Sequence, residues 1–280
     1  MNYKQYKNLS ADYIEKKINE FVLEDIPNVD ITTKATTLKK QISANIINEE
    51  DAVFSGKNII KYFFPNCNVI ININDGDKIK KNELIGTITG NATTILSNER
   101  IMLNLIQRLC GIATYTNCYV QLVNNKVKIL DTRKTTPGLR LFEKYAVTCG
   151  GGYNHRLDLS AGYLIKDNHL ATSHSIEKII NNIKNITNYK PIEVEVDTID
   201  QIRRILPLNI DGFLLDNMNP NLTKDCVQII KKYNNNIFIE SSGGITLNNI
   251  ESYLDTGINA ISVGALTHQA QNINIKLEFI

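Results

Sequence analysis

Short apolar runs in the second half of the chain each end in charged or polar side chains. Five such ends carry Asp131, Arg133 and Lys134; Lys166 and Asp167; Glu195 and Asp197; Asp216 and Asn217; and Glu240, Ser241 and Ser242. In parallel β/α architectures the carboxyl ends of the strands line the active site. A purely structural domain would avoid five charged strand ends in series, because burying charge costs desolvation free energy. The pattern therefore predicts an active site at one edge of a parallel sheet.

Cationic side chains gather between residues 133 and 166. The set is Arg133, Lys134, Arg140, His155, Arg156 and Lys166. Guanidinium groups bind carboxylates at two points, and such a cluster in a chain of net charge +2 indicates a strongly anionic ligand. We expect His155 to contact this ligand, while His169 could be catalytic or could support another residue. Glu195 and Asp216 would face the same cavity, where carboxylates beside phosphate-binding groups bind a divalent metal or sugar hydroxyls.

Glycines follow the last two apolar runs. Residues 241–244 read Ser-Ser-Gly-Gly, and Gly264 stands two residues after Ser262. Glycine lets a phosphate approach bare backbone N–H groups, and barrels commonly bind phosphate after their last two strands. These glycines could equally do no more than form tight turns. Beside the charged strand ends, phosphate binding is the favoured interpretation.

Six apolar runs and the segments between them must position these residues. The runs are VKILDT, YLIKDN, IEVEVD, GFLLDN, IFIESS and AISVGA, and helical stretches separate them. Spacings of roughly 20–35 residues are typical of strand-helix units, and buried parallel strands read as continuous apolar runs. The repetition predicts either a β/α barrel or a doubly wound sheet. No GxGxxG follows the first run, which disfavours a dinucleotide-binding sheet.

The remaining segments predict a smaller domain with an antiparallel sheet. Residues 11–23 have helical apolar spacing, and residues 69–73 alternate before an Asp-Gly-Asp turn. The apolar spacing from 97 to 124 predicts long helices, with Ser97 as the N-cap. Residues 272–279 alternate and should form a last strand on the first domain. We therefore expect an N-terminal domain over residues 1–110, with the tail 270–280 packed on it, and a catalytic domain over 111–269.

Composition excludes several classes of protein. The 280 residues include 31 Lys plus Arg and 29 Asp plus Glu, so no basic excess suggests nucleic-acid binding. No segment approaches the ~20 apolar residues of a membrane helix, and the first residues do not resemble a signal peptide. Five cysteines without a CxxC pair argue against a disulfide framework or a zinc site. A cytoplasmic location is expected.

Several long motifs resemble the quinolinate phosphoribosyltransferase family, also called nicotinate-nucleotide pyrophosphorylase (carboxylating). They are DTRKTTPGLR at 131–140, EKYA at 143–146, GGGYNHR at 150–156, IKDNH at 165–169, EVEVD at 193–197, LDNM at 215–218, ESSGGIT at 240–246 and ISVGALT at 261–267. The resemblance spans nearly the whole chain. One departure is Asn82-Glu83, where the family pattern has a glycine after the Asp-Gly-Asp turn.

The resemblance implies a fold, a reaction and an assembly. The fold is α/β: an N-terminal α+β open-faced sandwich domain joined to an incomplete β/α barrel. The reaction transfers phosphoribosyl from phosphoribosyl pyrophosphate (PRPP) to the ring nitrogen of quinolinate. Nicotinate mononucleotide enters NAD biosynthesis, and carbon dioxide and pyrophosphate are released. Family members form homodimers, some of which assemble further to hexamers, and Mg²⁺ accompanies PRPP.

The resemblance also assigns roles to residues that match its motifs. Arg133, His155, Arg156 and Lys166 would hold the two quinolinate carboxylates, with Arg100 reaching in from the partner subunit. Lys134 would meet the phosphate or pyrophosphate of PRPP. The ribose hydroxyls would be held by Glu195 and Asp216, which would also hold magnesium, either directly or only through PRPP. The backbone at Ser242, Gly243 and Gly264 would hold the 5′-phosphate. Lys134, Lys166, Glu195 and Asp216 form the expected catalytic set.

Three other functions compete with this interpretation. The first is a paralogue of the same family, associated with molybdenum transport, that uses another acceptor. The second is a Schiff-base aldolase in which Lys166 attacks a carbonyl. The third is a phosphate-binding module without catalytic activity, in which the acidic strand ends would have no purpose.

Overall fold

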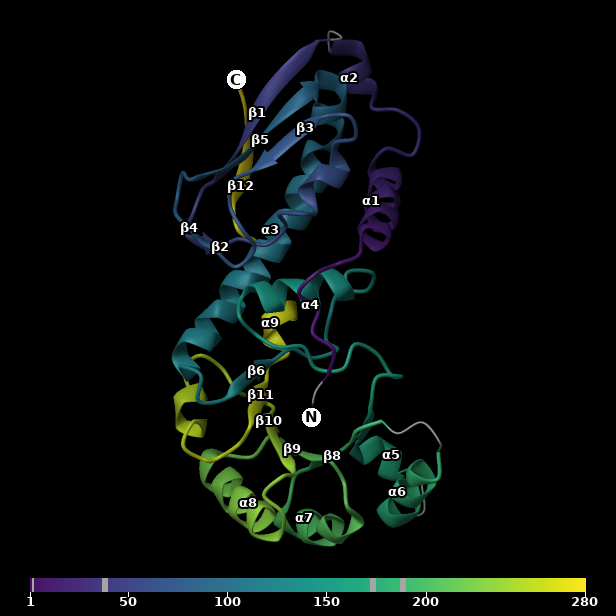
Figure 1. Cartoon of the computed structure of the whole chain (residues 1–280), viewed down its shortest axis with the longest axis vertical. Coiled ribbons are helices and arrows are strands. Elements are labelled where there is room, and N and C mark those ends of the chain that lie inside the picture. Colours follow the sequence, from purple (N-terminus) through teal and green to yellow (C-terminus); the bar gives the residue numbers. More distant parts are fainter. Residues whose placement is uncertain (2, 37–39, 172–174, 187–189) are drawn as a thin grey trace. The chain divides into compact units, whose positions relative to one another are not determined.

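The computed structural model describes residues 1, 3–36, 40–171, 175–186 and 190–280, and Figure 1 shows the chain as a ribbon. The chain divides into two compact units. The first unit comprises Met1–Gln5, Cys118–Thr135 and Gly152–Ala265. The second comprises Tyr6–Asn117, Thr136–Gly151 and Leu266–Ile280. Each unit is built from several separate stretches of sequence, so neither corresponds to one continuous segment.

A six-stranded parallel sheet forms the core of the first unit. Its strands are β6 (Lys128–Leu130), β7 (Tyr163–Ile165), β8 (Ile192–Val196), β9 (Gly212–Asp216), β10 (Phe238–Ser242) and β11 (Ala260–Ser262). The order across the sheet is β6-β11-β10-β9-β8-β7. All six strands expected from the apolar runs are present. Strands β7 to β11 follow chain order across the sheet and β6 pairs beyond β11, with β6 and β7 left as open edges. This order agrees with an incomplete barrel, whereas a doubly wound sheet would reverse its strand order at a switch point.

Helices connect these strands, and Figure 1 shows them along the outside of the sheet. They are α5 (Asp167–Ala171), α6 (Ile176–Lys184), α7 (Ile199–Ile205), α8 (Pro220–Tyr233) and the 3₁₀ helices η2 (Leu206–Leu208) and η3 (Ile250–Tyr253). Their starts are defined by side-chain caps: Ser175, Thr198 and Asn219 each accept a hydrogen bond from a backbone N–H in the first turn. Such caps satisfy donors that a helix otherwise leaves free. Of these helices, α5, α7 and α8 begin two to four residues after a strand ends.

Strand β8 shows how the sequence directs charge to one face of the sheet. Successive side chains of a strand point to opposite faces. Ile192, Val194 and Val196 thus share one face and are buried, while Glu193 and Glu195 lie on the other. The apolar face packs in the core of the unit, and the acidic face is available for chemistry.

The second unit contains an antiparallel sheet in the order β12-β1-β5-β3. Its strands are β1 (Gln41–Asn48), β3 (Asn68–Ile71), β5 (Leu84–Asn91) and β12 (Ile275–Phe279), and β2 (Ala52–Val53) pairs with β4 (Lys78–Ile79). The tail strand β12 pairs with β1, with Ile46 opposite Leu277. The helices are α1 (Ala11–Asp25), α2 (Ile31–Thr36), η1 (Ile60–Phe63), α3 (Ala92–Val123), α4 (Arg140–Cys149) and α9 (Ala265–His268), and the ends of α3 and α9 extend into stretches of the first unit.

The N-terminus of α3 differs from the sequence expectation. The helix begins at Ala92, so Ser97 is not its N-cap. The side chain of Asn91 accepts hydrogen bonds from the backbone N–H groups of Thr93 (2.9 Å) and Thr94 (3.4 Å), and it therefore performs the capping function. Ser97 instead donates to the Asp30 carboxylate at 2.9 Å. The expectation was wrong because the buried residues of the helix extend back to Ala92 and Ile95.

Asn82 occupies the position where the family pattern has a glycine. Its φ of 66° is in the left-handed region that favours glycine, and asparagine tolerates this region better than most residues. The turn is therefore preserved without the glycine.

Among the described residues, no helix combines the length and the hydropathy needed to cross a membrane.

Candidate functional site

The carboxyl ends of β8, β9 and β10 bring three predicted site residues onto one face of the parallel sheet. Glu195 on β8 lies opposite Leu214 on β9, so Asp216 follows two residues later on the same face. Asp216 in turn lies opposite Ser242 on β10. The register therefore places a carboxylate on each of two neighbouring strands, with Ser242 and Gly243 beside the second.

Lys166 follows β7 directly, and its ammonium group forms an ion pair with the Glu195 carboxylate. The Lys166 side chain is 40% exposed and that of Glu195 is 14% exposed. The family resemblance implies that Lys166 binds the acceptor and that Glu195 binds the sugar. Their contact makes the two expected subsites adjacent in this unit.

The loop that carries His155 and Arg156 is held by a buried carboxylate. Asp131, fully buried after β6, accepts a hydrogen bond from the backbone N–H of His155 at 2.8 Å. Its second oxygen accepts from the Asn154 side chain at 2.7 Å. Sequence reasoning placed Asp131 at a strand end but gave it no specific role. Its position just before the cationic motif is the signal that could have identified it.

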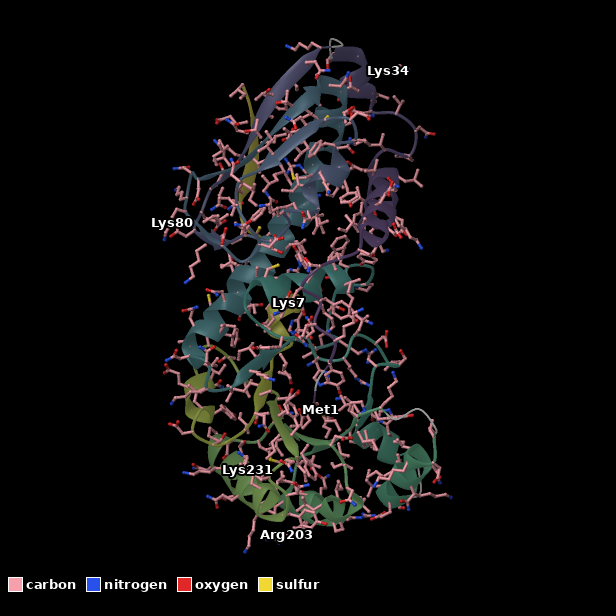
Figure 2. All side chains as sticks on the ribbon, in the orientation of Figure 1. Met1, Lys7, Lys34, Lys80, Arg203 and Lys231 are labelled. Carbon is pink, nitrogen blue, oxygen red and sulfur yellow. The ribbon has the colours of Figure 1, made fainter. Side chains whose placement is uncertain are left out.

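Two guanidinium groups lie close together in this unit. Arg156 is only 7% exposed, unlike surface cations such as Lys34, Lys80 and Arg203 (Figure 2). Its Nη1 donates to the Gly162 carbonyl at 3.0 Å. Burial lowers the pKa of the Arg156 guanidinium, and the positive charge of Arg133 lowers this pKa further.

Arg133 also has an unused donor. Its Nε is buried and has no hydrogen-bond partner among the described residues. Two neighbouring cations repel each other unless an anion lies between or beside them. The arrangement therefore suits a ligand with carboxylate groups, which guanidinium groups can bind in a bidentate manner.

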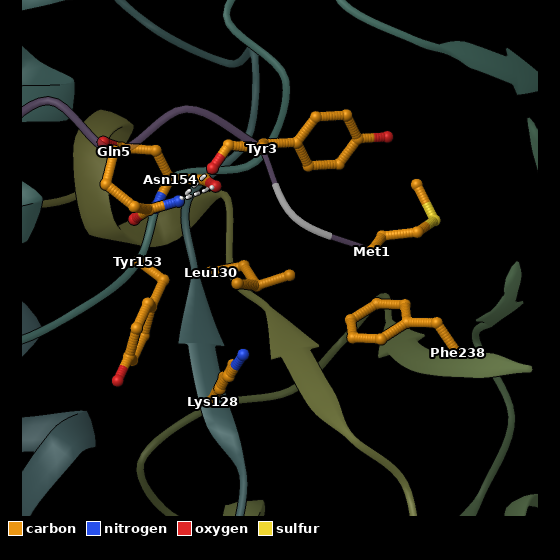
Figure 3. Close-up of a pocket in the computed structure, with 8 residues that line it drawn as sticks. All are labelled: Met1, Tyr3, Gln5, Lys128, Leu130, Tyr153, Asn154 and Phe238. Carbon is orange, nitrogen blue, oxygen red and sulfur yellow. Dashed lines mark hydrogen bonds between the residues drawn. The ribbon is translucent and has the colours of Figure 1, made fainter. Parts of the chain in front are cut away.

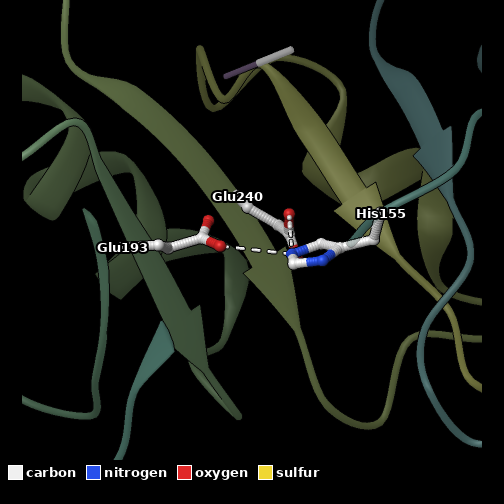
Figure 4. A group of neighbouring side chains, drawn as sticks. All are labelled: His155, Glu193 and Glu240. Atoms are coloured by element: carbon white, nitrogen blue, oxygen red, sulfur yellow. Dashed lines mark hydrogen bonds and ion pairs between the residues drawn. The ribbon is translucent and has the colours of Figure 1, made fainter. Parts of the chain in front are cut away.

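His155 is enclosed by acidic side chains (Figure 4). Its Nε2 lies 3.1 Å from Glu193 Oε2 and 3.5 Å from Glu240 Oε2. Its Nδ1 accepts a hydrogen bond from the backbone N–H of Arg156 at 2.7 Å. Because Nδ1 is used as an acceptor, the proton of a neutral imidazole is on Nε2 and points to the carboxylates.

Burial raises the pKa of both carboxyl groups around His155. The pKa of Glu193 and that of Glu240 each rise to about 7, mainly because both groups are fully enclosed. The three side chains could be mistaken for a metal site, since their ligand atoms lie within 4.8 Å of one another. A metal bound to Nε2 would require the imidazole proton to be on Nδ1. Because Nδ1 accepts a hydrogen bond from the Arg156 N–H, a neutral His155 cannot bind a metal in this arrangement. The sequence analysis assigned no role to Glu193.

The glycines after β10 differ in their surroundings. Gly243 has φ +86°, and a Cβ added there would collide with the side chain and the backbone of Asn217. The backbone N–H of Asn217 donates to the Ser242 carbonyl at 2.8 Å, so these two loops are tied together. Gly244 has φ +65° and open space around it. Gly264 stands after β11, where Ser262 lies opposite Ser242.

The remaining predicted residues are less closely tied to this group. Lys134 is exposed, and its backbone N–H donates to the Thr132 hydroxyl at 3.0 Å. Arg100, on α3, and Arg140, on α4, both belong to the second unit, and Arg100 is exposed. All the other predicted site residues lie in the first unit.

A cavity of about 240 Å³ lies beside β6 and β10 (Figure 3). It is lined by Met1, Tyr3, Gln5, Lys128, Leu130, Tyr153, Asn154 and Phe238. Lys128 begins β6 and Phe238 begins β10, while Leu130 ends β6 and Asn154 directly precedes His155. The cavity therefore extends from the start of these strands to the loop that carries His155.

Comparisons with known proteins agree with this architecture. The family described as "Quinolinate phosphoribosyl transferase, N-terminal domain" matches residues 30–110, and its C-terminal domain matches residues 112–278. A Bacillus subtilis (strain 168) protein named "Probable nicotinate-nucleotide pyrophosphorylase (carboxylating)" is 40% identical over 95% of this chain and 93% of its own length. A Mycobacterium leprae (strain TN) nicotinate-nucleotide pyrophosphorylase (carboxylating) is 36% identical over 89% of this chain and 91% of its own. The solved structure of the Francisella tularensis nicotinate-nucleotide pyrophosphorylase has a TM-score of 0.92, with 34% identity over the full length of both chains.

Proposed function

Because the chain belongs to the quinolinate phosphoribosyltransferase family, we propose that it transfers the phosphoribosyl group of PRPP to the ring nitrogen of quinolinate. As a pentosyltransferase of NAD biosynthesis, it forms nicotinate mononucleotide, carbon dioxide and pyrophosphate. The observation that carries this proposal is the pair of neighbouring guanidinium groups, Arg133 and Arg156, in the same unit as the carboxylates of Glu195 and Asp216. One set suits a dicarboxylate and the other suits a sugar.

The cationic set binds the acceptor. Arg133 and Arg156 bind the two carboxylates of quinolinate, with His155 and Lys166 beside them. Both substrates carry several negative charges, so they would repel each other in a site without cations. The cationic side chains offset this repulsion and raise the local concentration of both anions.

The acidic residues act on the donor. As the bond from the ribose carbon to pyrophosphate breaks, that carbon acquires positive charge, which Glu195 and Asp216 stabilise at close range. The ring nitrogen of quinolinate then forms the new bond to this carbon. Lys134 meets the departing pyrophosphate, and the backbone N–H groups at Ser242, Gly243 and Gly264 hold the 5′-phosphate.

Loss of carbon dioxide needs no further acid or base. Once the ring nitrogen is bonded to ribose, the ring is positively charged. It accepts the electron pair of the breaking bond to the adjacent carboxylate, and a proton from water replaces that carboxylate. Positioning and electrostatics are therefore sufficient for this step.

Mg²⁺ is part of the proposal, and the residues present fit it. Glu195 and Asp216 present carboxylate oxygens on one face of two neighbouring strands. Magnesium prefers hard oxygen ligands and is commonly bound by one or two carboxylates together with substrate phosphates. When bound, it supplies neutralisation of charge on the pyrophosphate.

A homodimer is also proposed, on the strength of the family resemblance. In such a dimer Arg100 would enter the site of the partner subunit. Its exposed position on α3 leaves its guanidinium available for this contact. Arg100→Ala and Arg133→Ala chains are each expected to be inactive, and mixing them should restore part of the activity. No recovery despite demonstrated subunit exchange would remove Arg100 from the partner's site.

Location in the cytoplasm stays a prediction.

The direct test is an assay of the purified chain with quinolinate, PRPP and Mg²⁺. We expect stoichiometric release of pyrophosphate and carbon dioxide, together with nicotinate mononucleotide. Nicotinate serves as the control acceptor because it has one carboxylate and should react far more slowly. Turnover of nicotinate but not quinolinate, or no turnover of either, would refute the proposal.

The aldolase alternative is weakened by one contact. An attacking lysine must be a neutral amine, whereas the Lys166 nitrogen is ion-paired with Glu195. Borohydride trapping of a carbonyl compound on Lys166 would reverse this conclusion. The molybdenum-associated paralogue is separated from the main proposal by the same quinolinate assay.

A further inference from the structure

We propose that Tyr3 and Glu193 are positioning residues of the quinolinate site, because together they hold the ring of His155 and, through it, Arg156. This inference rests on the proposed function. Neither residue is among those that the family motifs assign to a substrate. Both lie in the first unit with His155 and Arg156.

The edge of the imidazole ring links a carboxylate to the backbone of Arg156. Glu193 is fully buried, and its Oε2 lies 3.1 Å from His155 Nε2. On the other side of the ring, Nδ1 accepts from the Arg156 N–H at 2.7 Å. Glu193 therefore fixes both the tautomer and the orientation of the ring that holds Arg156.

The face of the same ring packs against Tyr3. The two ring centroids are 4.7 Å apart with an interplanar angle of 29°. The Tyr3 hydroxyl is buried without a hydrogen-bond partner among the described residues. What Tyr3 contributes is thus its aromatic ring, and such ring pairs contribute about 0.5–1.5 kcal/mol beyond burial.

Tyr3 also contacts the second anchor of Arg156. A Cβ added to Gly162 would lie 3.0 Å from Tyr3 Cε1, so the tyrosine ring lies against this glycine. The carbonyl of Gly162 accepts from Arg156 Nη1 at 3.0 Å. Tyr3 therefore supports both groups that hold Arg156, one at its backbone and one at its guanidinium.

The N-terminal segment is itself anchored to the loop that it supports. The Gln5 side chain donates to the Asn154 carbonyl at 3.0 Å and accepts from the Asn154 N–H at 2.8 Å, as Figure 3 shows. This two-point contact is made to the residue just before His155. Residues at positions 3 and 5 thus brace the acceptor-binding loop through the stacked ring and this two-point contact.

The test compares truncating and conservative variants of both residues. Tyr3→Ala and Glu193→Ala should each raise the KM for quinolinate about threefold to tenfold, because Arg156 loses a fixed position. The KM for PRPP should stay within about twofold of the original value. Tyr3→Phe keeps the ring, and Glu193→Gln keeps an acceptor for His155, so both should restore most of the quinolinate affinity. Tyr233→Ala serves as the control, since Tyr233 is 54% exposed on α8.

A spectroscopic readout tests the contact without relying on turnover. The chain has four histidines, so ¹⁵N-histidine spectra are simple enough to follow His155. Tyr3→Ala should shift the His155 ring protons by removing the tyrosine ring current, and Tyr3→Phe should not. Glu193→Ala should change the tautomer signature of the ring nitrogens.

The outcomes separate this inference from the proposed function. No quinolinate turnover by the unsubstituted chain refutes the function, while the histidine spectra still test the contacts. Turnover with an unchanged quinolinate KM in Tyr3→Ala overturns the positioning role alone. Equal losses for quinolinate and PRPP would also overturn it, because they indicate a general structural effect. If Glu193→Ala does not fold, the comparison of Tyr3→Ala with Tyr3→Phe tests the positioning role.

Discussion

Both units bury a glutamate completely, but the two environments differ. In the second unit, Glu143 on α4 accepts from Arg108 at 3.0 and 3.2 Å, and from the N–H and hydroxyl of Thr136 at 3.0 and 2.9 Å. In the first unit, Glu193 keeps one oxygen and Glu240 keeps both oxygens without a hydrogen bond among the described residues.

This difference separates two uses of buried charge. A buried ion whose oxygens are all paired contributes to a fixed scaffold. Buried carboxylates with unused oxygens cost free energy, and natural proteins tend to retain such groups where a site needs them. The first unit holds carboxylates with unused oxygens beside the predicted substrate residue His155. Glu143 shows that the second unit can satisfy a buried acid fully.

The largest effect is expected at the scaffold pair. Glu143→Ala should lower the free energy of unfolding by about 3–5 kcal/mol, because Arg108 and Thr136 lose their shared acceptor. Urea unfolding measures this change. The control is Lys126→Ala, which breaks an exposed ion pair with Asp255 and should cost about 0.5 kcal/mol or less. Similar losses of unfolding free energy in both variants would show that Glu143 does not contribute to a fixed scaffold.

The next effect concerns ligand binding. Arg156→Ala should weaken quinolinate binding roughly a hundredfold, since one of the two guanidinium groups that suit a dicarboxylate is lost. PRPP binding should change by less than about threefold. Arg203→Ala, which removes an exposed cation from α7 of the same unit, is the matched control. Equal weakening of both ligands in a calorimetric titration would contradict the assignment.

A smaller effect should appear in the pH dependence of stability. The pKa of Glu240 is raised to about 7 by burial and by Glu193 and Asp131, while His155 and Ser262 oppose the rise. The folded chain therefore holds a proton that the unfolded chain releases near its ordinary pKa of 4.5. The contribution of Glu240 to stability should be largest below that value, and about 2 kcal/mol of this contribution should be lost between pH 5 and pH 8.

Glu240→Gln isolates this contribution. The amide does not ionise, so the decline in unfolding free energy between pH 5 and pH 8 should become shallower. Unfolding curves at several pH values for both proteins provide the measurement. An unchanged slope would show that Glu240 is already ionised in the folded chain at pH 5.

The smallest effect distinguishes two adjacent glycines. Gly243→Ala should raise the KM for PRPP about tenfold, because its Cβ would collide with Asn217. Gly244→Ala meets no atom within 4 Å and should raise this KM only about twofold. Steady-state kinetics of the two variants, with quinolinate saturating, makes the comparison. An equal effect would mean that backbone strain, rather than the contact with Asn217, determines the loss.

Much of the fold could be predicted because its signals are local. All six parallel strands appear as continuous apolar runs, and their polar ends identify the edge that carries Glu195 and Asp216. The start of α3 was wrong because Ser97 and Asn91 are both acceptable caps, and only packing of Ala92 and Ile95 decides between them.

The partners of the site residues could not be predicted in the same way. Nothing in the local sequence connects Tyr3 with His155, or distinguishes Glu193 from Glu195 on the same strand face. Both distinctions depend on how deeply each side chain is buried and on which distant segment reaches it.

The order of strands and helices could be predicted from the sequence pattern, and so could the edge of the sheet where charge collects. These features follow from side-chain periodicity and backbone preferences, which act over a few residues. The folded chain was needed to show that Lys166 pairs with Glu195, that Asp131 holds the loop of His155, and that Tyr3 packs on the His155 ring. Such contacts join residues far apart in the chain, and they form only when the strands of the sheet have assembled.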